Sequence, residues 1–324
     1  MLNFAIILMT FWGKARKILP LIGIAIFVYL LIKLNVVEII KQIENIKFPY
    51  MIIAIIFVFI YLLFATAKWF IIARKQGMKI PFVKAFKINL ITDFYGFVTP
   101  ARLGSAMRAD YLKKYSGNVG KGLSNFVIDK VLDLSSLFIM AIGLGFVFSK
   151  SIGITSISSI FILLALFLTM ILISLIFYKK ESSKFFLRTI YRKFIPNSMK
   201  NKAKQMFDSF YKDMPKLGFL ILVFLVNLMT WIVNYFIIYL VGLSLGININ
   251  FIYYLAIFPI ATLIAQIPIT ISGLGTREIT LIGLFGLFGV EAVKVFSMAL
   301  IGLFITSIIP ALFAIYFMLK EKSK

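Results

Sequence analysis

The sequence contains no cysteine and no histidine. Without cysteine the chain has neither disulfides nor thiolate chemistry, and without histidine it has no imidazole base and none of the common zinc sites. An enzyme built from this chain would have to work with carboxylates, hydroxyls or lysines alone. We therefore expect no metal and no cofactor.

Acidic residues are also scarce, with 12 Asp and Glu against 35 Lys and Arg, for a formal net charge of +23. The basic residues gather in loops next to hydrophobic stretches, which is the pattern of cytoplasmic loops in membrane proteins. No separate basic domain or recognisable binding motif accompanies the charge, so we expect no nucleic-acid partner.

Apolar residues are abundant, since 61% of the chain is hydrophobic. Several stretches reach the roughly 20 apolar residues that span a bilayer. The longest polar stretch, Lys179 to Lys216, is shorter than the roughly 50 residues of a small soluble domain. The sequence therefore predicts an all-α, polytopic protein of the cell membrane, with residues 1–324 forming one integral membrane domain.

About six stretches are expected to cross the membrane, and the basic segments beside them place both termini in the cytoplasm. These stretches are Ile18–Val36, Tyr50–Ala73, 125–148, Ile154–Tyr178, Leu217–Val241 and Val293–Leu319. After the first stretch, apolar residues recur at helical spacing from Val36 to Ile46, which predicts a short helix on the membrane surface.

The segment from Lys179 to Lys216 holds eleven basic and three acidic residues interleaved with aromatics. This pattern predicts basic amphipathic helices lying on an anionic leaflet. The alternative interpretation is a solvated charged loop, which the many aromatic residues make less favourable.

Two further apolar stretches break at short turns that contain glycine, Thr99–Gly104 and Thr270–Gly275. The first is expected to be a re-entrant hairpin open to the cytoplasm, and the second a re-entrant hairpin open to the outside. Oppositely oriented broken helices are typical of inverted-repeat transporters. We therefore predict inverted-repeat-like halves at about 50–150 and 217–319, joined by residues 179–216. A shift of 171 residues superposes Thr99 on Thr270 and Gly104 on Gly275, and little else matches.

The first turn carries residues suited to an anion. Pro100 removes a backbone donor and Gly104 permits unusual dihedral angles, so backbone groups are freed from helix bonding. Arg102 and Arg108 lie beside these groups, and arginine presents a planar fork suited to phosphate. The alternative, strongest for Arg108, is an ordinary cytoplasmic loop whose arginines follow the positive-inside rule.

At the second turn, Arg277 and Glu278 follow Gly273 and Gly275. The positive-inside rule does not explain Arg277, because this turn is expected within the membrane or near its outer face. Intramembrane ionisable residues are functional candidates by default. The alternative is a structural ion pair that holds the hairpin.

Asp129 and Asp133 are spaced to share one helix face. They either balance Arg102 or Arg108, or cap the start of a helix at the interface. The candidate substrate-binding residues are Thr99, Pro100, Arg102, Gly104, Arg108, Asp129, Asp133, Thr270, Gly273, Gly275, Arg277 and Glu278. Glycines on apolar stretches predict close helix packing instead; these are Gly143, Gly145, Gly283, Gly286 and Gly289.

Three segments carry a family resemblance: Tyr95 to Arg108, Ile128–Asp133 and Ile267–Glu278. They resemble the lysylphosphatidylglycerol synthase transmembrane region, or flippase-like, family. That family has a Pro-turn-Gly-Glu-x-x-Arg segment, a Glu-Arg-x-x-Asp segment and a Pro-x-Thr-x-Gly-Gly-x-Gly-x-x-Glu segment. The chain departs from these patterns in two places, with Ser105 in place of Glu and Asp129-Lys130 in place of Glu-Arg.

The resemblance implies a membrane domain that moves lipids between leaflets. The sequence includes neither the soluble synthase nor the glycosyltransferase domain found attached in some relatives, so a stand-alone member is expected. We predict a lipid translocase, not an enzyme, with an anionic or phosphate-bearing lipid headgroup as its partner. The alternatives are a non-catalytic partner of a separately encoded synthase or glycosyltransferase, and a membrane-embedded lipid-modifying enzyme. The sequence leaves open the lipid, the direction of transport, the coupling and the oligomeric state, including a homo-oligomer.

Overall fold

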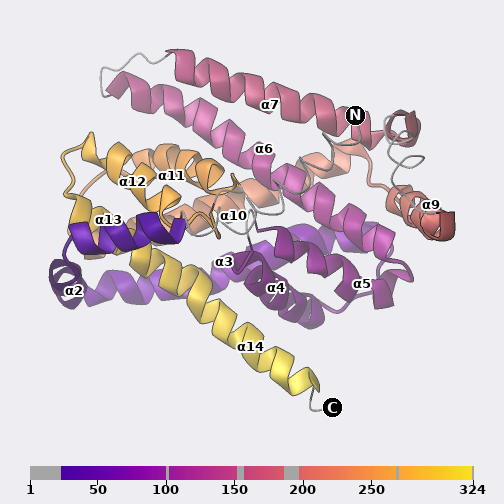
Figure 1. Cartoon of the computed structure of the whole chain (residues 1–324), viewed down its shortest axis with the longest axis horizontal. Helices are drawn as coiled ribbons and strands as arrows, with labels where there is room; N and C mark the ends of the chain where they lie inside the picture. The colour runs from indigo at the N-terminus through magenta and orange to yellow at the C-terminus, as the bar shows by residue number, and fades with distance from the viewer. Residues whose placement is uncertain (1–22, 100–101, 152–156, 186–196, 268–269, 323–324) are drawn as a thin grey trace, which may run out of the picture. The chain divides into compact units, whose positions relative to one another are not determined.

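The computed structural model describes residues 23–99, 102–151, 157–185, 197–267 and 270–322. These residues form helices joined by short connections (Figure 1), so the all-α prediction is confirmed. After the helix Gly23–Lys33, the elements are α2 (Val36–Glu44), α3 (Phe48–Lys75), α4 (Phe82–Phe97), η1 (Leu103–Met107), α5 (Arg108–Ser116), α6 (Val119–Ser151), α7 (Ile157–Tyr178), α9 (Asn197–Tyr211), α10 (Leu217–Ser244), α11 (Phe251–Ala265), α12 (Thr276–Gly286), α13 (Ala292–Leu303), η2 (Phe304–Ile308) and α14 (Ile309–Lys322).

Three of the described helices are long and apolar enough to cross a membrane, namely α3, α10 and the continuous run Ala292–Lys320. The helix Gly23–Lys33 and α2 form a fourth if this pair, bent by 76°, counts as one span. The apolar parts described for α7 and α11 are shorter, Leu164–Leu175 and Phe251–Ala265. A polytopic membrane protein is thus confirmed, while six spans, two re-entrant hairpins and cytoplasmic termini stay predictions.

The chain divides into two compact units. Unit 1 comprises residues 1–59, 90–105 and 234–324, and unit 2 comprises residues 60–89 and 106–233. The boundaries differ from those of the predicted halves, and the inverted repeat stays a prediction.

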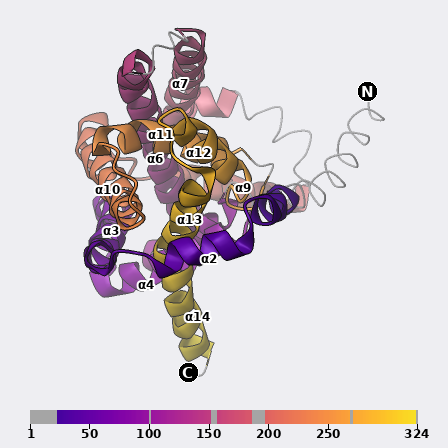
Figure 2. The same cartoon turned by 90° about the vertical axis from the view of Figure 1, so that its left-hand side faces the viewer.

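In unit 1, α2 lies beside α13 (Figures 1 and 2), where Ile39 packs against Leu30 and Phe296. The predicted short helix after the first span is therefore present as α2. Several of its apolar side chains are exposed, including Val37 and Ile40, as expected for a helix that meets lipid.

Still in unit 1, α11 and α12 pack through aromatic rings. Tyr254 stacks on Phe258 with ring centroids 5.8 Å apart, and Phe285 meets both rings edge-on. These rings supply a large apolar contact between the first half of α11 and the end of α12, away from the second turn, which joins the two helices.

In unit 2, α6 and α7 run side by side (Figure 1), and Phe138 meets Phe167 between them. The start of α6 packs closely on α9, because a Cβ on Gly120 would lie 2.2 Å from the Met206 carbonyl oxygen. α9 confirms a helix within the basic segment 179–216, whereas residues 186–196 lie outside the described part. The location of α9 on a membrane surface stays a prediction.

Within the part of the chain that the structure describes, the glycines predicted to pack closely have no close neighbour. Among the described atoms, none lies within 4 Å of a Cβ added at Gly143, Gly145, Gly283, Gly286 or Gly289. Close packing at these positions is therefore wrong for the part of the chain that the structure describes. Small residues that do permit close contact include Gly122 against Ala109 and Gly302 against Ile238.

Candidate functional site

The first turn is organised around the Thr99 hydroxyl. Its Oγ1 donates to the Tyr95 carbonyl at 2.9 Å and accepts the Gly104 amide at 2.7 Å. A Cβ on Gly104 would lie 2.1 Å from the Tyr95 carbonyl oxygen. Gly104 is not among the residues with positive φ. The predicted reason for this glycine is therefore wrong: it admits the close approach of two backbone segments, not unusual dihedral angles.

The residue of this turn with a left-handed backbone conformation is instead Arg102, with φ 54°. Its carbonyl accepts hydrogen bonds from the Ser105 hydroxyl at 2.7 Å and the Ser105 amide at 3.2 Å. Such a conformation is uncommon in a residue with a side chain and persists only where the surroundings hold it. Pro100, the other predicted residue of the turn, lies outside the described residues.

The second turn contains consecutive left-handed residues, Ser272 and Gly273, followed by Gly275 at φ 82°. Thr270 Oγ1 and Thr276 Oγ1 lie 3.2 Å apart across it. A Cβ on Gly273 would lie 2.2 Å from that of Ala265 at the end of α11, so the turn folds closely onto its own helix.

Glu278 stabilises the start of α12 through hydrogen bonds. Its Oε2 accepts the Gly275 amide at 2.6 Å, and its Oε1 accepts Arg277 Nε at 3.0 Å and Nη2 at 2.8 Å. The Glu278 side chain is 1% exposed and that of Arg277 is 19% exposed. The structural ion pair considered as an alternative is thus present, and part of the Arg277 side chain stays exposed.

The two turns meet. Ser272 Oγ donates to the Phe97 carbonyl at 2.6 Å, across 175 residues of sequence and within unit 1. The first described helix packs against the second turn, because a Cβ on Gly23 would lie 2.5 Å from Thr270 Cβ and one on Gly275 would lie 2.5 Å from the Gly23 carbonyl oxygen. Ser272 and Gly23 were not predicted, since neither belongs to a charge or spacing pattern that marks a contact.

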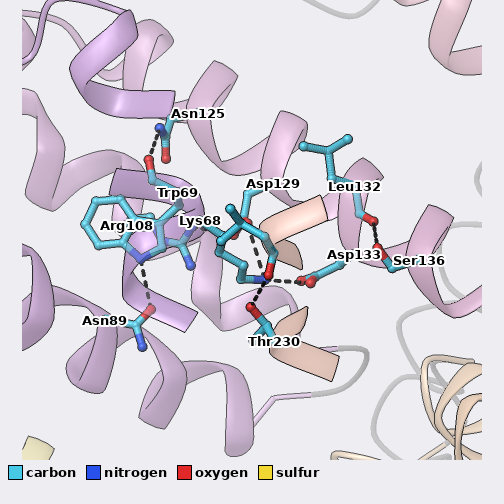
Figure 3. Close-up of polar contacts among 11 residues, drawn as sticks. Lys68, Trp69, Asn89, Arg108, Asn125, Asp129, Leu132, Asp133, Ser136 and Thr230 are labelled. Atoms are coloured by element: carbon cyan, nitrogen blue, oxygen red, sulfur yellow. Dashed lines mark hydrogen bonds and ion pairs between the residues drawn. The ribbon is translucent and has the colours of Figure 1, made fainter. Parts of the chain in front are cut away.

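In unit 2, four charged side chains, three of them buried and Asp133 half-buried, form a second cluster, which we call the charge quartet: Lys68, Arg108, Asp129 and Asp133 (Figure 3). Arg108 Nη1 donates to Asp129 Oδ2 at 2.6 Å. Lys68 Nζ lies 2.5 Å from Asp133 Oδ1 and 3.3 Å from Asp129 Oδ1. The two cations and two carboxylates sum to zero, which is how charges are tolerated away from water.

Arg108 is held from a second side. Its guanidinium lies over the Trp69 ring at 4.8 Å, and Trp69 Nε1 donates to Asn89 Oδ1 at 2.9 Å. Asn125 Nδ2 donates to the Trp69 carbonyl at 3.0 Å. Arg108 is only 3% exposed, so the alternative of an ordinary loop arginine is wrong.

The alternative that Asp129 and Asp133 cap a helix at the interface is also wrong. α6 begins at Val119, so both carboxylates lie well inside the helix, and they share one face as predicted. Asp129 balances Arg108, as the other interpretation proposed. Lys68 was missed, although a lone lysine inside the apolar stretch Tyr50–Ala73 is a signal that could have found it.

We expect Glu278→Ala to lower the free energy of unfolding by about 3 kcal/mol, because it removes one partner of a largely buried pair and frees the Gly275 amide. Thermal unfolding of the purified protein in detergent measures the change. Glu291→Ala is the matched control: Glu291 is 65% exposed and pairs with Lys294 at 3.3 Å, so its removal should cost less than about 1 kcal/mol. Equal losses in the two variants would contradict this role for Glu278.

Comparison with known proteins identifies the family. Residues 18–314 match the family model described as "Lysylphosphatidylglycerol synthase TM region". A "UPF0104 membrane protein" from Methanocaldococcus jannaschii is 25% identical over 292 residues, covering 85% of each chain. Another from Methanothermobacter thermautotrophicus is 23% identical over 290 residues, covering 85% of this chain and 86% of the relative. The chain therefore belongs to the lysylphosphatidylglycerol synthase transmembrane-region family.

Proposed function

We propose that this protein is a lipid translocase that binds an anionic, phosphate-bearing headgroup at the two joined turns while the acyl chains stay in the bilayer. The observation that carries the proposal is the hydrogen bond from Ser272 to Phe97, which joins two irregular, arginine-bearing turns in one compact unit. Irregular backbone at membrane depth is tolerated only where protein or water surrounds it, and it is used for substrate sites in transporters.

The second turn offers the chemistry that a phosphate needs. Arg277 presents a guanidinium fork that pairs bidentately with oxyanions, and its present partner is the Glu278 carboxylate. α12 begins directly after the turn, so the positive end of its dipole lies at the same place. We propose that the headgroup phosphate takes over Arg277 from Glu278, which keeps the cation neutralised when no substrate is bound.

Arg102 is the second proposed headgroup contact. It carries a guanidinium suited to phosphate, and its left-handed backbone in the first turn is the kind of strained conformation that clusters at functional sites. Arg108 is left out of the headgroup site, since Asp129 and Trp69 already hold its guanidinium in unit 2. This restricts the proposed contacts to unit 1, with Thr99, Thr270 and the turn glycines shaping the backbone around the arginines.

The proposal is tested with purified protein in vesicles that contain fluorescent lipids of different headgroups. We expect faster exchange between leaflets than in empty vesicles, and a rate about tenfold lower for Arg277→Ala, because one charge-assisted contact is worth about 1.5 kcal/mol or more. Arg74→Ala, an exposed arginine at the end of α3, should keep the wild-type rate.

Equal rates in empty and protein-containing vesicles across the lipid panel would overturn the proposal. Mass analysis of the lipids after incubation separates it from the enzyme alternative, because a translocase changes no covalent bond. Unchanged lipid masses together with accelerated exchange are the expected result.

A further inference from the structure

Six exposed lysines lie beside helix ends in unit 2, where α3 ends, α4 begins, α5 ends and α10 begins. We call them the lysine surface: Lys75, Lys79, Lys84, Lys113, Lys114 and Lys216. The sequence has no acidic residue from Lys75 to Thr92, and α5 has one, Asp110. None of the six lysines forms an ion pair with a described residue. The surface is thus positively charged without a counter-charge in the described part of the chain.

Packing contacts hold these helix ends together. α4 and α5 lie side by side (Figure 1), and one buried apolar cluster joins them to the end of α3. The cluster contains Ala73, Met78, Ile80, Ala85 and Leu112. Lys75 Nζ lies 5.5 Å from the centroid of the Phe219 ring, which joins the end of α3 to the start of α10. The six lysines therefore belong to one surface of a compact unit.

The connection from α3 to α4 is a tight turn around a glycine. Gly77 adopts φ 77°, and its amide donates to the Arg74 carbonyl at 3.0 Å. The Met78 amide donates to the Ala73 carbonyl at 2.9 Å. These are the two hydrogen bonds of a Schellman motif, in which a glycine commonly ends a helix. The motif fixes the backbone on both sides of the turn, so the lysines before and after it are held at the surface.

The charge of Lys84 does not stabilise its own helix. Lys84 lies in the first turn of α4, which contains no acidic residue. A cation is unfavourable there, because the start of a helix is the positive end of its dipole. Lysines at the ends of α3 and α5 have an explanation within the fold, since cations are favourable at a helix C-terminus. Lys84 has none of this kind, and an anion outside the chain would supply one.

The lysine surface lies at the depth expected for lipid headgroups. α3 and α10 are both long and apolar enough to cross a membrane, and each has 28 residues. A helix of 28 residues is about 42 Å long, which matches the thickness of a bilayer with its headgroups. We therefore expect the end of α3 at Lys75 and the start of α10 at Leu217 to lie among the headgroups.

Exposed apolar side chains border the lysines. Val83 is 66% exposed next to Lys84, and Leu217 is 58% exposed next to Lys216. An acidic protein would match the positive charge alone. An anionic leaflet matches both features, because its phosphates meet the ammonium groups and its acyl chains meet the apolar side chains.

We infer that the lysine surface binds anionic lipid headgroups of the leaflet at this end of unit 2, with Val83 and Leu217 in contact with acyl chains. The binding requires a negative headgroup but does not select one headgroup structure, because lysine is a point charge without the planar fork of arginine. The surface lies in unit 2, whereas the proposed translocation site lies in unit 1. The inference holds whether or not the protein moves lipids.

The absence of cysteine allows the contact to be measured at a single labelled position. Val83→Cys carries a fluorophore on the lysine surface, and Val37→Cys, which replaces a 56% exposed valine on α2 in unit 1, is the matched control. Each labelled protein is placed in phosphatidylcholine vesicles with a little nitroxide-labelled phosphatidylglycerol or, separately, nitroxide-labelled phosphatidylcholine. Quenching of the fluorophore measures how often each lipid contacts it.

At position 83 we expect a preference of about fivefold for phosphatidylglycerol, the factor that one basic residue near an anionic surface contributes. The preference should fall toward one at high salt, because salt screens exposed charges. Lys79→Gln combined with Lys84→Gln should abolish it, whereas Lys79→Arg combined with Lys84→Arg should keep it. At position 37 we expect no such preference, since the neighbouring Lys41 is paired with Glu38 at 3.1 Å.

Equal quenching by the two lipids at position 83 would overturn the inference and make an acidic protein the better occupant. A preference that survives the paired Gln substitutions, or that is as large at position 37, would overturn it as well. The assay contains no transport step, so these results leave the proposed function untouched.

Discussion

Asp129→Asn is expected to lower the free energy of unfolding by about 3–5 kcal/mol, the loss typical of breaking a buried ion pair from one side. The substitution keeps the shape of the side chain but leaves Arg108 and Lys68 with one carboxylate between them. The quartet then carries a net charge of +1 at a place where Arg108 is 3% exposed. Thermal unfolding in detergent, followed by the loss of monodisperse protein, measures the change.

A double-mutant cycle separates charge imbalance from lost packing. Asp129→Asn combined with Arg108→Met removes both members of one pair and leaves Lys68 beside Asp133 at 2.5 Å. Methionine packs well on aromatic rings such as Trp69, so we expect the double variant to recover most of the lost stability. Asp213→Asn serves as the control, since its pair with Lys121 involves a 47% exposed carboxylate and should contribute at most about 1 kcal/mol. If Asp129→Asn unfolds like the wild type, the quartet does not stabilise the fold.

Gly104→Ala is expected to cost about 3 kcal/mol or more, because the added methyl group meets backbone and not a movable side chain. Its Cβ would lie 2.1 Å from the Tyr95 carbonyl oxygen and 2.8 Å from Thr99 Oγ1. The first turn would have to open, which would break the bond from the Gly104 amide to Thr99 and displace the Phe97 carbonyl from Ser272. We therefore expect both lower thermal stability and slower lipid exchange.

Gly143→Ala is the matched control for this substitution. Gly143 is an exposed residue in the middle of α6, and none of the described atoms lies within 4 Å of a Cβ added there. Alanine favours a helix over glycine by up to about 1 kcal/mol, so this variant should be as stable as the wild type or more stable. A Gly104→Ala protein that matches Gly143→Ala in stability and rate would refute the close backbone contact at the first turn.

Much of the architecture follows from periodic sequence patterns. Long apolar stretches predict α3 and α10 because a bilayer admits few other structures, and the spacing of the isoleucines after Val36 predicts α2. The irregular turns are also visible in the sequence, since Thr99–Gly104 and Thr270–Gly275 interrupt apolar stretches with residues that disfavour helix. These signals are local, and each lies within one or two turns of chain.

Partners are harder to predict than elements. The sequence marks Arg277 and Glu278 as adjacent charges, and their pairing is almost forced by that adjacency. It marks Asp129 and Asp133 as one face of a helix, but their cationic partners are distant in the sequence. Lys68 lies 65 residues from Asp133, and Arg108 lies 21 residues from Asp129. Arg108 could be a loop residue or a buried one on sequence grounds, and only the Trp69 ring and the Asp129 carboxylate decide between them.

By itself the sequence determined that this is a helical membrane protein without cysteine or histidine chemistry. It also marked two irregular turns, and a few charged residues in or beside apolar stretches, as candidate functional residues. Composition and periodicity suffice for this, because the bilayer imposes the same hydrogen-bonding rule on every segment. Only the tertiary structure decided that Ser272 joins the turns, that Gly104 is required for backbone approach, and that Lys68 completes a neutral quartet. Such contacts depend on which distant side chains share a buried space, where each charge must find its partner.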